Sequence, residues 1–244
     1  MRTKTLLLSA VALFAAGVVS TQAQQVYSKN VVGYANVVTP GGGTYLLAVP
    51  FVIGQSNGAN EIWPSGTLPN FSTILIWDPN ILDYYTYLSK NSSPSGWADA
   101  NLVNTPAPIL PVGQGFFLIP SDDTTNTFSG TILPNVGTTN ATLLGGGGTY
   151  LVSSAVPYAG PVTNGSATYV GGPNLSGAGG LPNFSTLLIW DPNISDYATY
   201  NSKNSSPSGW SDANLANLPV PPSVSVGQAY FLIPSDDFNW QVGL

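Results

Sequence analysis

The amino-acid sequence predicts an all-β protein with two tandem homologous units, each a β-sandwich or barrel-like unit with long loops rich in Gly, Pro and Ser. Its apolar runs are short and rich in branched and aromatic residues, which is typical of strands. Gly occurs 27 times and Pro 21 times, too often for long helices. A long stretch of the chain also occurs twice. We therefore expect little helix beyond the N-terminal segment.

Residues 1–23 have the three parts of a secretory signal peptide. Arg2 and Lys4 form a positive start, residues 6–19 are an apolar run, and small residues precede a cleavage site after Ala23. The run of about 14 residues is shorter than the roughly 20 that span a bilayer. The sequence therefore predicts secretion to the extracellular space or cell surface, with the periplasm as the alternative, and no membrane span in the mature chain.

The duplication is visible in two blocks of the sequence. Residues 68–102 recur as residues 181–215, with 30 of 35 positions identical. Downstream, the sequence VGQGFFLIPSDD at residues 112–123 recurs as VGQAYFLIPSDD at residues 226–237. Because the blocks keep their order, the chain contains a tandem repeat rather than scattered similarities.

These repeats predict the domain organisation. The predicted parts are, in order, the signal peptide at 1–23, an N-terminal strand segment at 24–40, β repeat unit 1 at 41–136, a linker at 137–142 and β repeat unit 2 at 143–244. The N-terminal segment has no counterpart in sequence before unit 2. We therefore expect it to form a lone strand at residues 30–38.

Within each unit, turn residues separate the predicted strands. An Asp-Pro-Asn turn joins two strands into a hairpin in both units, and a Pro ends the strand of the VGQ block. The predicted strands are residues 72–77, 84–87, 115–119 and 124–132 in unit 1, and residues 185–190, 197–200, 229–233 and 238–244 in unit 2. A short helical turn is expected near residues 97–102.

The chain resembles a set of uncharacterised secreted bacterial proteins with an N-terminal VVGYxN motif and tandem β repeats. The matching residues are 31–36, then 74–77, 96–97 and 112–120 in unit 1, and 187–190, 209–210 and 226–234 in unit 2. They cover nearly the whole mature chain. The resemblance implies secretion and a β fold, and it implies no particular activity.

Composition excludes several classes of function. The chain has no His and no Cys, so the usual general base, thiolate chemistry and nearly all zinc sites are missing. The mature chain keeps Lys29, Lys90 and Lys203 against eleven acidic residues, which disfavours nucleic acid and anionic membranes as partners. A Ser nucleophile would lack a His partner, and Glu61 is the only Glu. We therefore expect the protein not to be an enzyme.

Six aromatic residues are candidate ligand-binding residues because they occupy the same positions in both units. They are Trp77, Tyr84 and Trp97 in unit 1, and Trp190, Tyr197 and Trp210 in unit 2. Exposed rings of this kind stack on sugar rings, as in carbohydrate-binding modules. Buried, the same rings would fill the cores of the two units. Both interpretations remain open from the sequence.

The repeated acidic turns are candidate calcium sites. Their oxygen-bearing residues are Asp78, Asn80 and Asp83 in unit 1, and Asp191, Asn193 and Asp196 in unit 2. Oxygen ligands at short spacing suit Ca²⁺, although the spacing is not that of an EF-hand. The alternative is that these side chains bond their own backbone in tight turns. No other cofactor is expected.

Secretion, duplication and the lack of catalytic residue types predict a non-catalytic structural or adhesive protein of the cell surface or extracellular matrix. The alternative is a carbohydrate-binding module that uses the repeated Trp and Tyr residues, with duplication providing avidity. Possible partners are extracellular polysaccharide or other surface proteins. The sequence leaves open the oligomeric state and whether the two units pack together.

Overall fold

The computed structural model describes residues 32–64, 66–132, 141–154, 156–162, 181–203, 205–206 and 208–241. The predicted signal peptide lies outside these residues. Nearly all regular structure is antiparallel strand, and the helix α2 (Ala59–Ile62) has only four residues. The prediction of an all-β fold is therefore confirmed. None of the helices described is long and apolar enough to cross a membrane.

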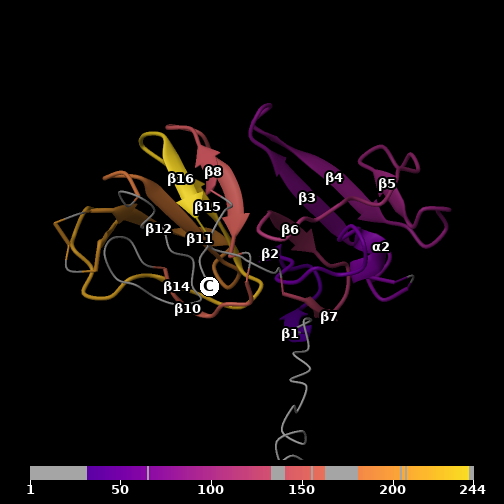
Figure 1. Cartoon of the computed structure of the whole chain (residues 1–244). Coiled ribbons are helices and arrows are strands. Elements are labelled where there is room, and N and C mark those ends of the chain that lie inside the picture. The colour runs from indigo at the N-terminus through magenta and orange to yellow at the C-terminus, as the bar shows by residue number, and fades with distance from the viewer. Residues whose placement is uncertain are drawn as a thin grey trace, which may run out of the picture. The chain divides into compact units, whose positions relative to one another are not determined.

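Each repeat is built around a five-stranded antiparallel sheet (Figure 1). In repeat 1 the order is β2 (Tyr45–Ala48), β6 (Gly115–Ile119), β3 (Thr73–Asp78), β4 (Asp83–Ser89) and β5 (Trp97–Asp99). In repeat 2 the order is β9 (Tyr150–Ser153), β15 (Ala229–Ile233), β11 (Thr186–Asp191), β12 (Asp196–Ser202) and β13 (Trp210–Asp212). The two sheets thus have the same strand order and the same connections.

The predicted Asp-Pro-Asn hairpins are present in both repeats. Strand β3 pairs with β4 so that Trp77 faces Tyr84 and Asp78 faces Asp83. Strands β11 and β12 pair in the same register. The helical turn expected near residues 97–102 is wrong, because residues 97–99 form strand β5 and Leu102 adopts a left-handed conformation, with a φ of 63°.

Each repeat also has a two-stranded ribbon. Strand β1 (Val32–Thr39) pairs with β7 (Thr124–Thr131), and β8 (Ala141–Leu144) pairs with β16 (Phe238–Gln241). The N-terminal strand therefore has a structural counterpart, β8, which begins inside the stretch expected to be a linker. Sequence comparison missed this equivalence because the two strands share a pairing role and not a sequence. A third short pair joins β10 (Gly160–Pro161) to β14 (Ser223–Val224).

The five-stranded sheets are buried on both faces. In β6, Phe116 and Leu118 belong to the core of repeat 1, whereas Phe117 belongs to a cluster shared by both repeats. Side chains alternate between the faces of a strand, so one strand serves two cores. In β15, Tyr230 and Leu232 fill the core of repeat 2 in the same way.

The shared cluster joins the two repeats through equivalent contacts. Buried side chains from both sheets form it: Leu46, Ala48, Phe117, Leu151, Ala229 and Phe231. The indole Nε1 of Trp77 donates to the carbonyl oxygen of Thr149 at 2.7 Å, and that of Trp190 donates to the carbonyl oxygen of Thr44 at 2.6 Å. Each repeat thus contributes the same donor and the same acceptor.

Backbone bonds complete this interface. The N–H of Ala48 in β2 donates to the carbonyl oxygen of Gly227 at 2.8 Å, and the N–H of Ser153 in β9 donates to that of Gly113 at 2.9 Å. Each donor is on the edge strand of one sheet, and each acceptor precedes the β6 or β15 strand of the other repeat. The arrangement is an internal version of the isologous interface of a two-fold dimer.

Candidate functional site

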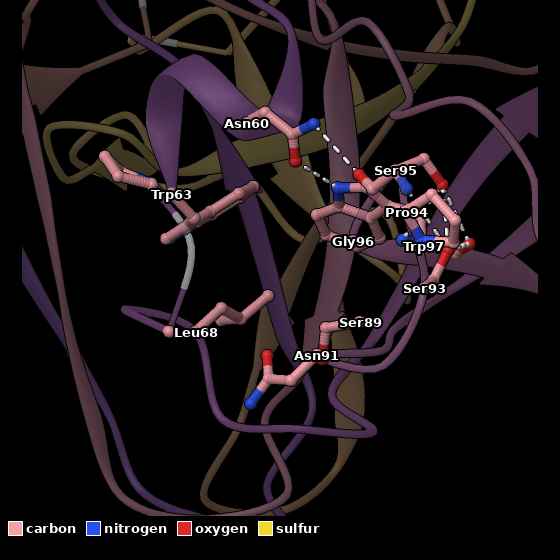
Figure 2. Close-up of a pocket in the computed structure, with 12 residues that line it drawn as sticks. Asn60, Trp63, Leu68, Ser89, Asn91, Ser93, Pro94, Ser95, Gly96 and Trp97 are labelled. Carbon is pink, nitrogen blue, oxygen red and sulfur yellow. Dashed lines mark hydrogen bonds between the residues drawn. The ribbon is translucent and has the colours of Figure 1, made fainter.

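A polar pocket of about 270 Å³ opens in repeat 1 between helix α2 and the turn before β5 (Figure 2). Its lining residues are Asn60, Trp63, Pro64, Gly66, Leu68, Ser89, Asn91, Ser93, Pro94, Ser95, Gly96 and Trp97. None of them is charged. The volume lies just below the range of roughly 300–1,000 Å³ typical of small-molecule sites, so the pocket suits a small neutral ligand.

Helix α2 holds one wall of the pocket in place. The Glu61 carboxylate accepts hydrogen bonds from the backbone N–H groups of Gln55, Ser56 and Gly58, which fixes the loop before the helix. Those hydrogen bonds favour the ionised form and lower the pKa of Glu61 to about 2. The loop and helix therefore keep Asn60 at the pocket rim at neutral pH.

Asn60 connects this wall to the opposite one. Its Oδ1 accepts from Nε1 of Trp97 at 2.7 Å, and its Nδ2 donates to the carbonyl oxygen of Ser95 at 3.0 Å, as the dashed lines of Figure 2 show. On the other side of the pocket, Nε1 of Trp63 donates to Oδ1 of Asn126 at 2.9 Å. Both indole N–H groups are used within the protein, and Trp63 and Trp97 are only 5% and 2% exposed, so a ligand would meet mainly the outer polar atoms.

The Pro-Ser-Gly-Trp turn forms the second wall. Gly96 has a φ of 78°, a conformation that Gly adopts without strain. The hydroxyl of Ser93 donates to the carbonyl oxygen of Trp97, and the hydroxyl of Ser95 lies within hydrogen-bond distance of the carbonyl oxygens of Trp97 and Thr105 and donates to one of them. The turn is thus a rigid element that presents serine oxygens next to the side chain of Asn91, which is exposed.

The structure separates the six predicted aromatic residues into two groups. Trp97 and Trp210 lie in the cores of their repeats, with 2% and 0% of their surface exposed. The other four are half-buried where the repeats meet: Trp77, Tyr84, Trp190 and Tyr197. Trp97 and Trp210 are therefore closed to a glycan, and packing between the repeats partly covers the other four rings.

Those four rings form a continuous aromatic cluster with two phenylalanines. Trp77 packs edge-on against Phe231 of the other repeat at 5.9 Å, and Trp190 packs in the same way against Phe117 at 5.8 Å. Burial raises the pKa of Tyr197 to about 12, with smaller contributions from Tyr84 and Asp196. In the structure, these residues pack the two repeats against each other.

The predicted calcium residues act as turn residues in the structure. Oδ1 of Asp78 accepts from the N–H and Nδ2 of Asn80, at 2.8 and 2.9 Å, and Asp191 and Asn193 repeat this geometry. Oδ1 of Asp83 accepts from the next backbone N–H, and Asp196 does the same. Within the described ranges, no three acidic side chains converge in a way that could hold a metal ion.

A second candidate surface is a set of three residues, two apolar and one lysine, that recurs at the same positions in both repeats. We call it the Phe-Leu corner: Phe71, Lys90 and Leu102 in repeat 1, and Phe184, Lys203 and Leu215 in repeat 2. The phenylalanines are 53% and 54% exposed and the leucines 52% and 46%. In each repeat the lysine Nζ donates to the leucine carbonyl oxygen, at 3.2 and 2.8 Å.

The backbone of the Phe-Leu corner is strained. Phe71, Phe184, Leu102 and Leu215 have φ values of 63°, 65°, 63° and 63°. Bulky residues avoid this left-handed region, which costs roughly 1–2 kcal/mol per residue. About half of each side chain stays exposed, and that exposed half adds nothing to the stability of the fold. Strain and exposure together are typical of a functional surface.

Sequence reasoning missed both of these surfaces. Asn60 and Trp63 lie in the stretch between the repeated blocks, where no sequence pattern marks them. The one available signal is that Trp63 shares this stretch with Glu61, the only Glu of the chain. The exposure of Phe71 and Leu102 depends on their backbone conformation, which the sequence does not reveal. The chain matches no family model, and comparison with the curated proteins and with the solved structures also finds no match.

Proposed function

We propose that the protein is a secreted, non-catalytic structural or adhesive protein that attaches to the cell surface or extracellular matrix through its Phe-Leu corners. The observation that carries this proposal is that both repeats expose the same strained apolar corner. Two identical corners on one chain would bind a repetitive surface with avidity, because the second contact forms intramolecularly. The predicted signal peptide supplies the route to that surface.

The test measures whether the protein stays with cells or matrix, or is released into the medium, when the corner residues are changed. We expect the native protein to remain with washed cells or matrix, and the double variant Phe71→Asn/Phe184→Asn to be released into the medium. Asn tolerates the left-handed conformation, so relief of strain offsets the lost burial and stability changes by about 0.5 kcal/mol or less. The matched control is Ile109→Ser/Val220→Ser, which changes two other exposed apolar residues, 57% and 67% exposed.

Equal retention of the corner variant and the control would overturn the proposal. Native protein found wholly in the medium would overturn it as well. A chelator arm tests the calcium prediction in the same experiment. If the acidic turns bind Ca²⁺, chelation will reduce retention or thermal stability, and Asp78→Asn/Asp191→Asn will abolish that effect.

A second candidate function is binding of a neutral saccharide, and the pocket of repeat 1 favours it. Amide groups and serine hydroxyls without charge are polar groups of the kind that recognise neutral sugars. We expect Asn91→Ala to weaken retention on a polysaccharide column at least fivefold. Asn204→Ala makes the same change at the corresponding position of the repeat 2 sequence and serves as the control. Equal retention of both variants would exclude this pocket.

A further inference from the structure

Among the described residues, strand β1 forms an open sheet edge, whereas the edge strands of both five-stranded sheets are covered. Strands β5 and β13 are covered by residues 103–105 and 216–218, which follow them and bond back to them. Strands β2 and β9 are each covered by the opposite repeat, through the bonds of Ala48 and Ser153. Strand β1 pairs with β7 on one side, and among the described residues no strand pairs with its other side.

The hydrogen-bond pattern shows which residues of β1 point outward. Thr131 of β7 exchanges both of its backbone bonds with Val52, at 2.8 and 3.0 Å, and therefore makes none with Val32, the residue opposite it. Bonded and non-bonded pairs alternate along an antiparallel ladder. Every second residue of β1, starting at Val32, therefore directs its N–H and C=O away from β7: Val32, Tyr34, Asn36 and Val38.

The same four residues carry the exposed side chains of the strand. Val32, Tyr34 and Val38 are 68%, 66% and 68% exposed, and Asn36 is also exposed. Natural edge strands are usually protected by a charge, a proline or a bulge. The eight residues VGYANVVT contain no charged residue and no proline, and their pairing with β7 has no bulge. Within the described part of the chain, this edge therefore carries none of the usual features that prevent another strand from joining it.

We propose that β1 pairs with β1 of a second copy of this chain, antiparallel across a two-fold axis. An uncharged edge neither repels its own copy nor selects an oppositely charged partner. The register follows from the outward residues, because a single register lets all four of them pair. In that register Val32 lies opposite Val38 of the second copy, and Tyr34 lies opposite Asn36. The two ribbons then join into one four-stranded sheet with an apolar strip on its exposed face. This proposal rests on sheet topology and is independent of the proposed function.

Analytical sedimentation of the purified protein without its predicted signal peptide tests whether β1 pairs with β1 of a second copy. We expect a reversible dimer for the native protein and at least a tenfold weaker dimer for Tyr34→Lys, which adds a charge to the edge. Val38→Pro removes one outward N–H and leaves the bonds to β7 intact, so it should weaken the dimer as well. Ser129→Lys adds the same charge on β7, opposite Tyr34, and should leave the dimer unchanged.

Cysteine cross-linking tests the register, and the chain has no cysteine of its own. Paired residues in such a ladder lie about 5.5 Å apart between Cα atoms, within reach of a disulfide. A mixture of the Val32→Cys and Val38→Cys proteins should cross-link under mild oxidation, and either protein alone should not. A native protein that stays monomeric up to about 100 µM would overturn the proposal. A dimer that persists unchanged in both edge variants would also overturn it.

Discussion

The ring of Phe117 lies 6.3 Å from the ring of Phe231, the residue at the same position of the other repeat. Each of these rings also meets the tryptophan of the opposite repeat edge-on, at 5.8 Å and 5.9 Å. Equivalent residues that contact each other mark an approximate two-fold axis between the repeats. The repeated aromatic residues therefore hold the two repeats together.

Gly115 and Ala229 occupy equivalent positions beside that axis. A Cβ added to Gly115 would lie 2.6 Å from Cβ of Ala229 and 2.7 Å from Cγ of Leu151. We expect Gly115→Ala to lower the free energy of unfolding by about 1–3 kcal/mol, because the packed interface must shift. The double variant Gly115→Ala/Ala229→Gly moves the methyl group to the other repeat and should recover much of that loss in urea denaturation. A double variant no more stable than the single one would contradict this packing.

The two interface tryptophans should be equivalent in energy. Trp77→Phe and Trp190→Phe each remove one indole N–H and leave a carbonyl oxygen, of Thr149 or Thr44, without that donor. We expect each to lower the free energy of unfolding by about 1–2 kcal/mol in urea denaturation. A loss confined to one variant would show that the two contacts differ in strength and would contradict the two-fold equivalence.

Interface stability should fall at high pH. Burial raises the pKa of Tyr197 to about 12 in the folded protein, whereas an unfolded tyrosine titrates near 10. Above pH 10 the unfolded state therefore holds fewer protons, so the stability present below pH 10 is lost as pH rises toward 12. We expect Tyr197→Phe to flatten part of this fall in denaturation curves measured at several pH values. The matched control Tyr85→Phe makes the same change at an exposed tyrosine outside the shared cluster.

A buried hydroxyl in repeat 2 should be dispensable. Tyr230 is fully buried, and its hydroxyl has no hydrogen-bond partner among the described residues. Repeat 1 has Phe116 at the same position. An unpaired buried hydroxyl costs roughly 1–3 kcal/mol. We expect Tyr230→Phe to raise the melting temperature and to increase the free energy of unfolding by about 1 kcal/mol. A lower melting temperature would mean that the hydroxyl is hydrogen-bonded in solution.

Local signals predicted the elements whose formation depends on neighbouring residues. The Asp-Pro-Asn turn and the apolar runs beside it gave the hairpin of β3 and β4, and Pro120 marked the end of β6. Strand β8 was not expected, because its pairing with β16 spans almost a whole repeat and leaves no local pattern. The N-terminal strand and strand β7 were both expected, but the pairing between them was not.

The candidate sites were harder to predict than the fold, because exposure is a property of packing. Trp97 and Trp77 look alike in sequence, yet one fills the core of a repeat and the other bonds across to Thr149. The acidic turns were recognisable because an Asx turn involves residues two positions apart. The pocket needs Asn60 and Trp97, which are far apart in the chain and meet through a hydrogen bond that spacing does not reveal.

The contact between the repeats forms within a single polypeptide, and this would matter for the secreted protein that we propose. Two separate chains that met through the bonds of Trp77 and Trp190 would dissociate on dilution. Covalent connection fixes the effective concentration of each repeat near the other, whatever the volume outside. Pairing through β1 has no such protection and would respond to the local density of the protein. The contact between the repeats would thus be independent of protein concentration, whereas the β1 pairing between two copies would depend on it.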